Sequence, residues 1–262
     1  MLVDYLFAEK RDGRALSPNW RERVVCPFCR MNNRQRLIAG LIRKVLRQDA
    51  STSRSVYFME QVTPIFNWAE QEFPDHYIVG SEYLGDAYQG GTVIRGVRHE
   101  DAMNLSFESD SLDLIVSNDV YEHVPRPTKA FAECLRVLKP GGQMLMTIPF
   151  HSRADVSVAR AVVEGGQISY LLPAEYHGNP VSTSGSLVFT DFGWDLLEEI
   201  RKAGFGDVAV ELYASQYHGH YGLRFDRDPG EPSQTLDRTH FRGHRRLLLH
   251  RGHPHRRQDD NG

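Results

Sequence analysis

The stretch HEDAMNLSFESDSLDLIVSNDVYEHVPRPTKAFAECLRVLKPGGQMLMTIPF, residues 99–150, contains two apolar runs separated by an amphipathic segment. The runs Leu112–Ser117 and Gln143–Ile148 have the length and apolar content of buried strands. Between them, Pro127 suits the first turn of a helix, and the LKPGG segment would stop that helix. A strand, a helix and a second strand in this order predict a βαβ unit in a parallel sheet.

The same alternation continues on both sides of this stretch. Four further strands are expected, at Val56–Met59, Tyr77–Gly80, Val93–Gly96 and Val208–Leu212. Another helix is expected from about Asp191 to Ala203, because Gly204 is a natural C-terminal cap. The sequence therefore predicts an α/β fold with a doubly wound, mostly parallel, Rossmann-like sheet and helices on both faces.

Composition divides the chain into three zones. Residues 1–50 hold a CPFC motif and an amphipathic helix capped by Asn32 or Asn33. Residues 51–221 form the α/β domain, in which 151–189 interrupt the alternation and are interpreted as an insert that covers an acceptor site. Residues 222–262 are rich in Arg and His and are predicted to be a disordered tail.

Charge and cysteine content restrict the cellular compartment and the classes of partner that we expect for the protein. A formal net charge of -3 gives no overall attraction to nucleic acid or to an anionic membrane. Three cysteines are too few for a disulfide framework, and no apolar run approaches the roughly 20 residues of a membrane span. We therefore expect a cytoplasmic protein that binds neither membrane nor nucleic acid. Its oligomeric state does not follow from the sequence.

The CPFC motif places Cys26 and Cys29 at the spacing of half a zinc site. A second pair at a suitable distance is missing, since Cys134 lies on the apolar stripe of a predicted helix. A reduced, metal-free knuckle is the favoured interpretation, with zinc as the alternative.

The block from Asp101 to Pro149 gives the chain its most specific resemblance. Its acidic loop, strand, polar strand end, helix and LKPGG turn resemble the class I S-adenosylmethionine-dependent methyltransferases, in particular the type 11 methyltransferase domain. The resemblance extends over roughly Ser55 to Leu212. It implies S-adenosylmethionine as cofactor and methyl transfer to a small-molecule or glycan-type acceptor. It also implies a seventh strand beside the sixth, for which RRLLLH at 245–250 is one option and an open sheet edge the other.

The resemblance also implies a set of cofactor contacts at the strand ends. Glu82 would bind the ribose hydroxyls, and Asp101 the adenine amine. The backbone of Ala102 or Met103 would contact the adenine ring. Near the first and fourth strand ends, Glu60 and Asn118 would bind the amino group of the methionine moiety. These contacts lie where ligands bind in open α/β sheets, beyond the carboxyl ends of the strands.

The turn after Glu60 departs from the family pattern, because Val62, Pro64 and Phe66 stand where glycines are usual. Glycine is required where a turn needs a positive φ or has no room for a Cβ. Three interpretations remain: a working site with an altered turn, a descendant that has lost the cofactor, or a resemblance of fold alone. The acids Glu60, Glu82 and Asp101 favour a working site.

Three histidines are candidate catalytic bases, namely His123, His151 and His177. His123 follows the fourth strand and could instead be a helix-start histidine bonded to the backbone. His177 lies in the insert and could equally be a surface residue. The alternative function is an inactive methyltransferase fold that serves as a scaffold. It would contact an anionic partner such as RNA through the basic helix at 34–47 and the tail.

Overall fold

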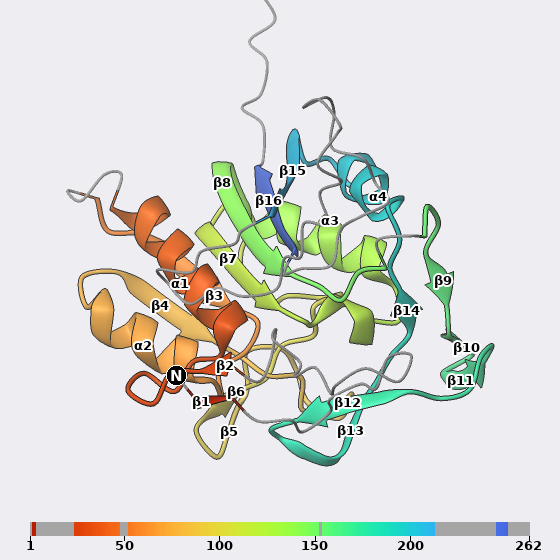
Figure 1. Cartoon of the computed structure of the whole chain (residues 1–262). Coiled ribbons are helices and arrows are strands. Elements are labelled where there is room, and N and C mark those ends of the chain that lie inside the picture. The colour runs from red at the N-terminus through yellow and green to blue at the C-terminus, as the bar shows by residue number, and fades with distance from the viewer. Residues whose placement is uncertain (1, 4–23, 48–51, 152–153, 213–244, 251–262) are drawn as a thin grey trace, which may run out of the picture.

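A six-stranded sheet lies at the centre of the protein, with helices on both faces (Figure 1). The computed structural model describes residues 2–3, 24–47, 52–151, 154–212 and 245–250. The sheet strands are β3 (Ser55–Phe58), β4 (Tyr77–Gly80), β7 (Leu112–Asn118), β8 (Leu138–Thr147), β15 (Asp207–Leu212) and β16 (Arg245–His250). Their spatial order is β15-β16-β8-β7-β3-β4, in which β8, β7, β3 and β4 are parallel and β16 is antiparallel to both of its neighbours. The predicted α/β fold with a mostly parallel sheet is confirmed.

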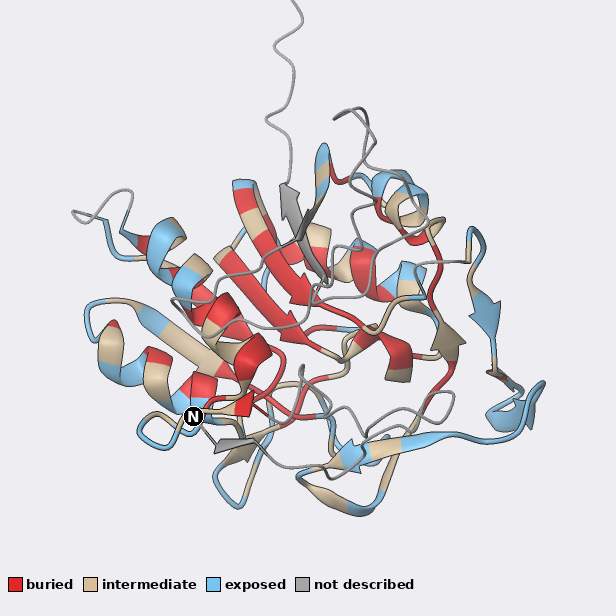
Figure 2. Ribbon diagram, viewed as in Figure 1, coloured by how far each residue is buried: buried red, intermediate tan, exposed pale blue. Residues whose placement is uncertain are grey.

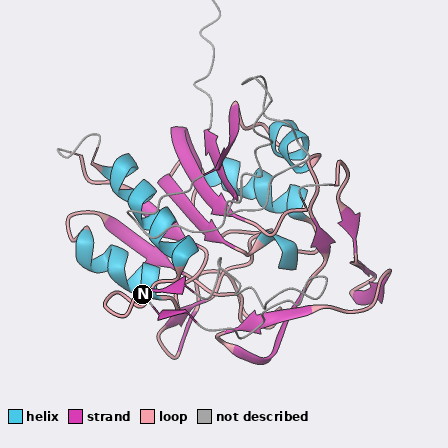
Figure 3. Cartoon of the chain, viewed as in Figure 1, coloured by secondary structure: helices cyan, strands magenta, loops and turns pink. Residues whose placement is uncertain are grey.

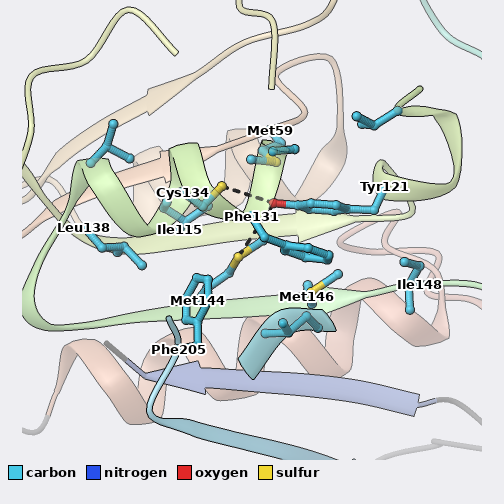
Figure 4. Close-up of a cluster of buried hydrophobic side chains, with 14 of the residues drawn as sticks. Met59, Ile115, Tyr121, Phe131, Cys134, Leu138, Met144, Met146, Ile148 and Phe205 are labelled. Carbon is cyan, nitrogen blue, oxygen red and sulfur yellow. Dashed lines mark hydrogen bonds between the residues drawn. The ribbon is translucent and has the colours of Figure 1, made fainter. Parts of the chain in front are cut away.

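Two pairs of helices cover the two faces of the sheet (Figure 3). They are α1 (Asn33–Leu46) and α2 (Pro64–Glu72) on one face, and α3 (Pro127–Val137) and α4 (Leu196–Lys202) on the other. Along β7, Leu114 and Val116 pack with α1 and α2, whereas Ile115 packs with α3 and α4. This alternation is expected of a strand buried on both faces. Figure 4 shows the second core, where Phe131 and Cys134 of α3 meet β7 and β8.

Local sequence explains where these helices begin and end. Asn32 caps α1: its side chain accepts from the amide of Gln35, whose side chain in turn accepts from the amide of Asn32. Pro127 stands at the start of α3, as predicted. The helix stops at Val137, three residues before Pro140, because the chain turns there into β8. Of the helix expected from Asp191 to Ala203, only the part within α4 forms.

The prediction of a sheet strand at Val93–Gly96 was wrong. The segment instead forms a small hairpin of β5 (Val93–Ile94) and β6 (Val97–Arg98), outside the main sheet. Gly96 has a φ of 83°, which suits the tight turn of that hairpin. After the hairpin, a parallel bridge between Glu82 and His99 joins the chain to the segment that follows β4.

The predicted C-terminal tail contributes a strand to the sheet. β16 lies between β15 and β8 and pairs over its whole length with β15. The RRLLLH option for a seventh strand is therefore confirmed, and the domain boundary drawn at residue 221 was too early. Apart from β16, the predicted tail at 222–262 lies outside the described residues.

The insert consists of short antiparallel strands rather than an irregular loop. They are β9 (Val158–Ala159), β10 (Ala161–Glu164), β11 (Gln167–Tyr170), β12 (Tyr176–Asn179) and β13 (Ser182–Leu187), and β14 (Thr190–Asp191) follows. β10 pairs with β11, β12 with β13, and β9 with β14. Most of β10 to β13 is exposed or half-buried (Figure 2). The insert returns to the domain through a 2.7 Å hydrogen bond from the Phe189 amide to the Glu122 carbonyl.

Two strands of two residues each precede the domain. β1 (Leu2–Val3) and β2 (Val24–Val25) pair antiparallel, and β2 leads directly into the CPFC motif. Among the helices of the described residues, none is long and apolar enough to cross a membrane.

Candidate active site

Buried polar side chains gather at the carboxyl ends of the parallel strands. Glu60 follows β3, Glu82 follows β4 and Asn118 ends β7, and each is no more than 9% exposed. Side chains beyond neighbouring parallel strands converge at one edge of the sheet, where α/β proteins bind their ligands. Three of the six predicted cofactor residues are thus brought to the same edge.

Glu60 and Asn118 form a direct pair. The backbone amide of Asn118 donates to Glu60 Oε2 at 3.2 Å, and its side-chain amide donates to Glu60 Oε1. Burial raises the pKa of Glu60 to about 8, although the Asn118 hydrogen bond and the charge of Arg34 act in the opposite direction. A carboxyl group in this state readily accepts a cationic partner, because a positive charge would restore the ionised form.

A polar network supports this pair from the side of α1. Arg34 donates to Thr147 Oγ1 at 3.2 Å and lies 3.5 Å from an Asp119 carboxylate oxygen. Thr147 Oγ1 is 3.4 Å from Asn118 Oδ1 and 3.1 Å from Asp119 Oδ1. The N-terminal helix therefore contributes a buried cation beneath the strand ends, and its Arg34 is not a surface residue.

Glu82 closes the glycine-free turn after β3. Its Oε1 accepts from the amides of Gln61 and Val62, at 2.9 and 2.8 Å. Burial raises the pKa of Glu82, while these two hydrogen bonds oppose the shift. None of residues 60–63 has a positive φ, so the turn has no need of a glycine. Thr63 then caps α2, accepting from the Phe66 amide at 3.3 Å.

The predicted adenine-binding segment lies after the β5–β6 hairpin. Asp101 is half-buried, and its Oδ1 accepts from the Met103 amide at 2.8 Å. This bond occupies the amide of Met103, which leaves Ala102 as the better candidate for the backbone contact. The neighbouring Glu100 is 2% exposed, and its carboxylate accepts hydrogen bonds from Arg98 and Ser106.

Glu122, His123 and His177 form a compact group that we call the acid–histidine cluster. Glu122 and His123 belong to the short 3-10 helix η1 (Tyr121–His123), and His177 comes from β12 of the insert. His123 Nε2 and His177 Nδ1 lie 3.6 and 3.7 Å from Glu122 Oε1. The two imidazole rings meet edge to face, 5.0 Å apart. The Glu122 carboxylate is the main cause of a raised His177 pKa, which burial partly offsets.

The three predicted histidines therefore separate into two groups. His123 and His177 meet around Glu122. His151 lies after β8 with its side chain 63% exposed, and its Nε2 is 3.8 Å from Asp191 Oδ1. His123 is also bonded to the backbone, as the alternative interpretation expects, since its Nδ1 is 2.9 Å from the Leu187 carbonyl oxygen.

The CPFC motif forms a tight turn without a further ligand among the described residues. The Cys26 amide donates to the Met31 carbonyl, and the Arg30 amide to the Cys26 carbonyl. A backbone hydrogen bond from Cys29 lowers the pKa of Cys26, whereas burial raises the pKa of Cys29. Within the described ranges, no other Cys, His, Asp or Glu joins the two thiols as a metal-binding group, and the metal-free knuckle stays a prediction.

Sequence reasoning missed three residues of this region: Arg34, Glu122 and Thr147. Arg34 and Thr147 lie within an expected helix and an expected strand, and Glu122 in the polar segment after the fourth strand, although a buried polar residue at any of these positions requires a partner. For Glu122, the adjacent His123 in the YEHV segment was the available indication.

Comparison with known proteins identifies the family of the central region. Residues 68–146 match the family model described as a methyltransferase domain. An uncharacterized methyltransferase of Mycobacterium avium (strain 104) is 34% identical over 105 residues, 38% of this chain and 39% of that protein. A ubiquinone biosynthesis O-methyltransferase of Xanthomonas oryzae pv. oryzae (strain PXO99A) is 36% identical over 70 residues, 27% of this chain and 28% of that protein.

A solved structure, described as an S-adenosylmethionine dependent methyltransferase from Mesorhizobium loti, aligns with 79% of this chain and 96% of its own. The identity is 15% and the TM-score 0.46. The match spans about two fifths of the length of the Mycobacterium avium and Mycobacterium marinum relatives. The family match begins at residue 68, so Glu60 and the turn after it lie outside the matched region. The family match and the mostly parallel sheet support a class I S-adenosylmethionine-dependent methyltransferase.

Proposed function

We propose that this protein transfers a methyl group from S-adenosylmethionine to a small-molecule or glycan-type acceptor. The observation that carries the proposal is the group of three buried polar side chains, Glu60, Glu82 and Asn118, at the ends of adjacent parallel strands. Buried polar groups at a surface edge of a sheet are costly unless a ligand or a partner engages them.

Each side chain suits one part of the cofactor. Glu60, with Asn118, would bind the cationic amino group of the methionine moiety. Glu82 Oε2 takes neither of the two turn bonds and is available for a ribose hydroxyl. Asp101 and the Ala102 backbone would contact adenine. The sulfonium already makes the methyl group electrophilic, so the protein has to align the acceptor and help it lose a proton.

The acid–histidine cluster is proposed to activate the acceptor. Glu122 and His123 lie four and five residues after Asn118 at the end of β7, and His177 approaches from the insert. Cofactor and acceptor would therefore meet between η1 and β12, with the insert over the acceptor.

The scaffold alternative is less well supported, because three basic residues of the segment 34–47 bind other side chains of the protein itself. Arg34 binds Thr147, and Arg43 and Arg47 both bind the Glu72 carboxylate. Titration calorimetry with S-adenosylhomocysteine tests the choice. Absence of heat and of a thermal shift at millimolar ligand would refute the enzyme proposal, and salt-dependent RNA binding in the same sample would support the scaffold.

Replacing Glu82 by Ala is expected to weaken binding of S-adenosylhomocysteine by about 1–3 kcal/mol. The variant loses a ribose contact and leaves the Gln61 and Val62 amides without their acceptor. Calorimetry gives the affinity. Glu198→Gln on exposed α4 is the control and should bind like the wild type, and equal affinity in both variants would contradict the role of Glu82.

Affinity for S-adenosylhomocysteine is expected to rise with pH up to about 8. The pKa of Glu60 is about 8 in the free protein, so below that pH the group is protonated and must lose its proton to pair with the ligand's amino group. The dissociation constant should fall by up to roughly tenfold per pH unit and level off above pH 8. Calorimetry at pH 6 to 9 measures this.

Two controls isolate Glu60 in that experiment. In Glu60→Gln the slope should disappear, together with part of the affinity. Methylthioadenosine lacks the amino group, so its affinity should not follow the same curve. An identical slope for both ligands would assign the titration to another group.

A further inference from the structure

The strongest unexplained feature is the carboxylate of Glu122. The residue is 1% exposed, and neither carboxylate oxygen has a hydrogen-bond partner among the residues that the structure describes. A buried carboxylate ordinarily accepts several hydrogen bonds, because removing its charge from water is otherwise costly. The groups that face it are the imidazoles of His123 and His177, both beyond hydrogen-bond distance.

One ring nitrogen of each imidazole faces this carboxylate. A carbonyl oxygen can only accept, so Nδ1 of His123 is the donor in the 2.9 Å contact with Leu187, and Nε2 is the nitrogen that faces Glu122. His177 has Nε2 3.5 Å from a Glu175 oxygen and Nδ1 toward Glu122. Metal-binding histidines show this arrangement, in which the second nitrogen donates to a carbonyl or carboxylate.

The spacing of the donor atoms fits a single ion. One donor atom from each of the three residues lies within 4.8 Å of the other two. Ligands at about 2.0 Å from a tetrahedral ion are roughly 3.3 Å apart. The observed 3.6 and 3.7 Å contacts therefore need only small side-chain movements, and the exposed insert that carries His177 can supply them.

From this geometry we infer that Glu122, His123 and His177 bind a divalent first-row transition-metal ion. Two imidazoles and one carboxylate suit Zn²⁺ or Fe²⁺ and form the three-ligand set of catalytic sites, which keep a position open. Its catalytic role rests on the proposed function: an acceptor oxygen in the open position would lose its proton more easily. The cluster would then act on the acceptor through the ion rather than as a base.

Metal binding can be measured on the full-length protein without any methyl acceptor. The protein is stripped with chelator, dialysed and titrated with Zn²⁺ by calorimetry and with Co²⁺ by visible absorption. We expect one equivalent bound through nitrogen and oxygen ligands. Glu122→Gln, His123→Asn and His177→Asn should each lose at least tenfold in affinity. His177→Asn is the safest of these for folding, because the residue is on the exposed insert.

Two controls separate this site from other ligands. His76→Asn removes a histidine before β4, at the opposite edge of the sheet, and should keep the ion. Cys26→Ser with Cys29→Ser should also keep it, and should leave the Co²⁺ spectrum unchanged. Binding that is lost in the cysteine variant, or that persists unchanged in the three cluster variants, would overturn the inference.

S-adenosylhomocysteine binding in the same samples distinguishes this inference from the proposed function. If the protein binds S-adenosylhomocysteine but no metal ion, the metal site is refuted and the methyltransferase proposal stands. If it binds the metal ion but not S-adenosylhomocysteine, the methyltransferase proposal is refuted and the metal site stands.

Discussion

His123→Asn is expected to lower the methyl-transfer rate by roughly 10² to 10⁴ while leaving affinity for S-adenosylhomocysteine nearly unchanged. His123 contacts Glu122 and the Leu187 carbonyl, and neither belongs to the proposed cofactor residues. The loss is expected whether the imidazole accepts a proton or holds an ion. The rate is measured as formation of S-adenosylhomocysteine with a panel of phenolic, amine and sugar acceptors.

The control for this variant is His76→Asn. It removes a histidine at the amino end of β4, away from the carboxyl ends of the strands, and should retain the rate. An unchanged rate in His123→Asn would remove His123 from the mechanism. Joint loss of cofactor affinity and thermal stability, with little effect on the chemical step, would instead show that the bond to Leu187 holds η1 in place.

Phe131→Ala is expected to lower the free energy of unfolding by about 3–5 kcal/mol. Phe131 is fully buried in α3, and its ring stacks on Tyr121 with centroids 4.3 Å apart and planes 9° from parallel (Figure 4). The cavity would lie directly beneath η1, because Tyr121 precedes Glu122. Urea denaturation followed by circular dichroism gives the change.

Phe28→Ala is the matched control, since Phe28 is 94% exposed and its loss should change stability by no more than about 0.5 kcal/mol. Methyl-transfer rates of the Phe131 variant at low temperature would report whether the packing under η1 also positions the cluster. A stability loss near 1 kcal/mol would mean that the core closes around the cavity.

The sequence predicted the central fold well, because the strand-helix-strand pattern of Leu112–Thr147 depends on local periodicity. Local patterns failed where long-range pairing decides. Val93–Gly96 has the composition of a strand, but its turn residues fold it back on itself. Arg245–His250 gave a weak indication by itself, and the open edge of β8 makes it a strand.

The residues of the candidate site likewise divide into those that local sequence predicts and those that depend on long-range contacts. The positions of Glu60, Glu82 and Asn118 could be predicted because each lies at a strand end or two residues beyond it, where position along the chain fixes position on the sheet. The cluster could not be assembled from the sequence, because His177 is 54 residues beyond His123 and reaches it through the fold of the insert. The two hydrogen bonds of Glu82 that replace the glycines depend on tertiary contact as well.

The place of β16 has a consequence for how the protein is made. β8 pairs on one side with β7 and on the other with a strand about 100 residues later in the chain, and β15 reaches the sheet only through that strand. During synthesis, the β8 edge therefore stays open until residues 245–250 have been translated. An open, apolar strand edge is prone to pair with other chains. Pauses or premature stops between residues 150 and 245 should accordingly yield aggregates rather than smaller folded proteins.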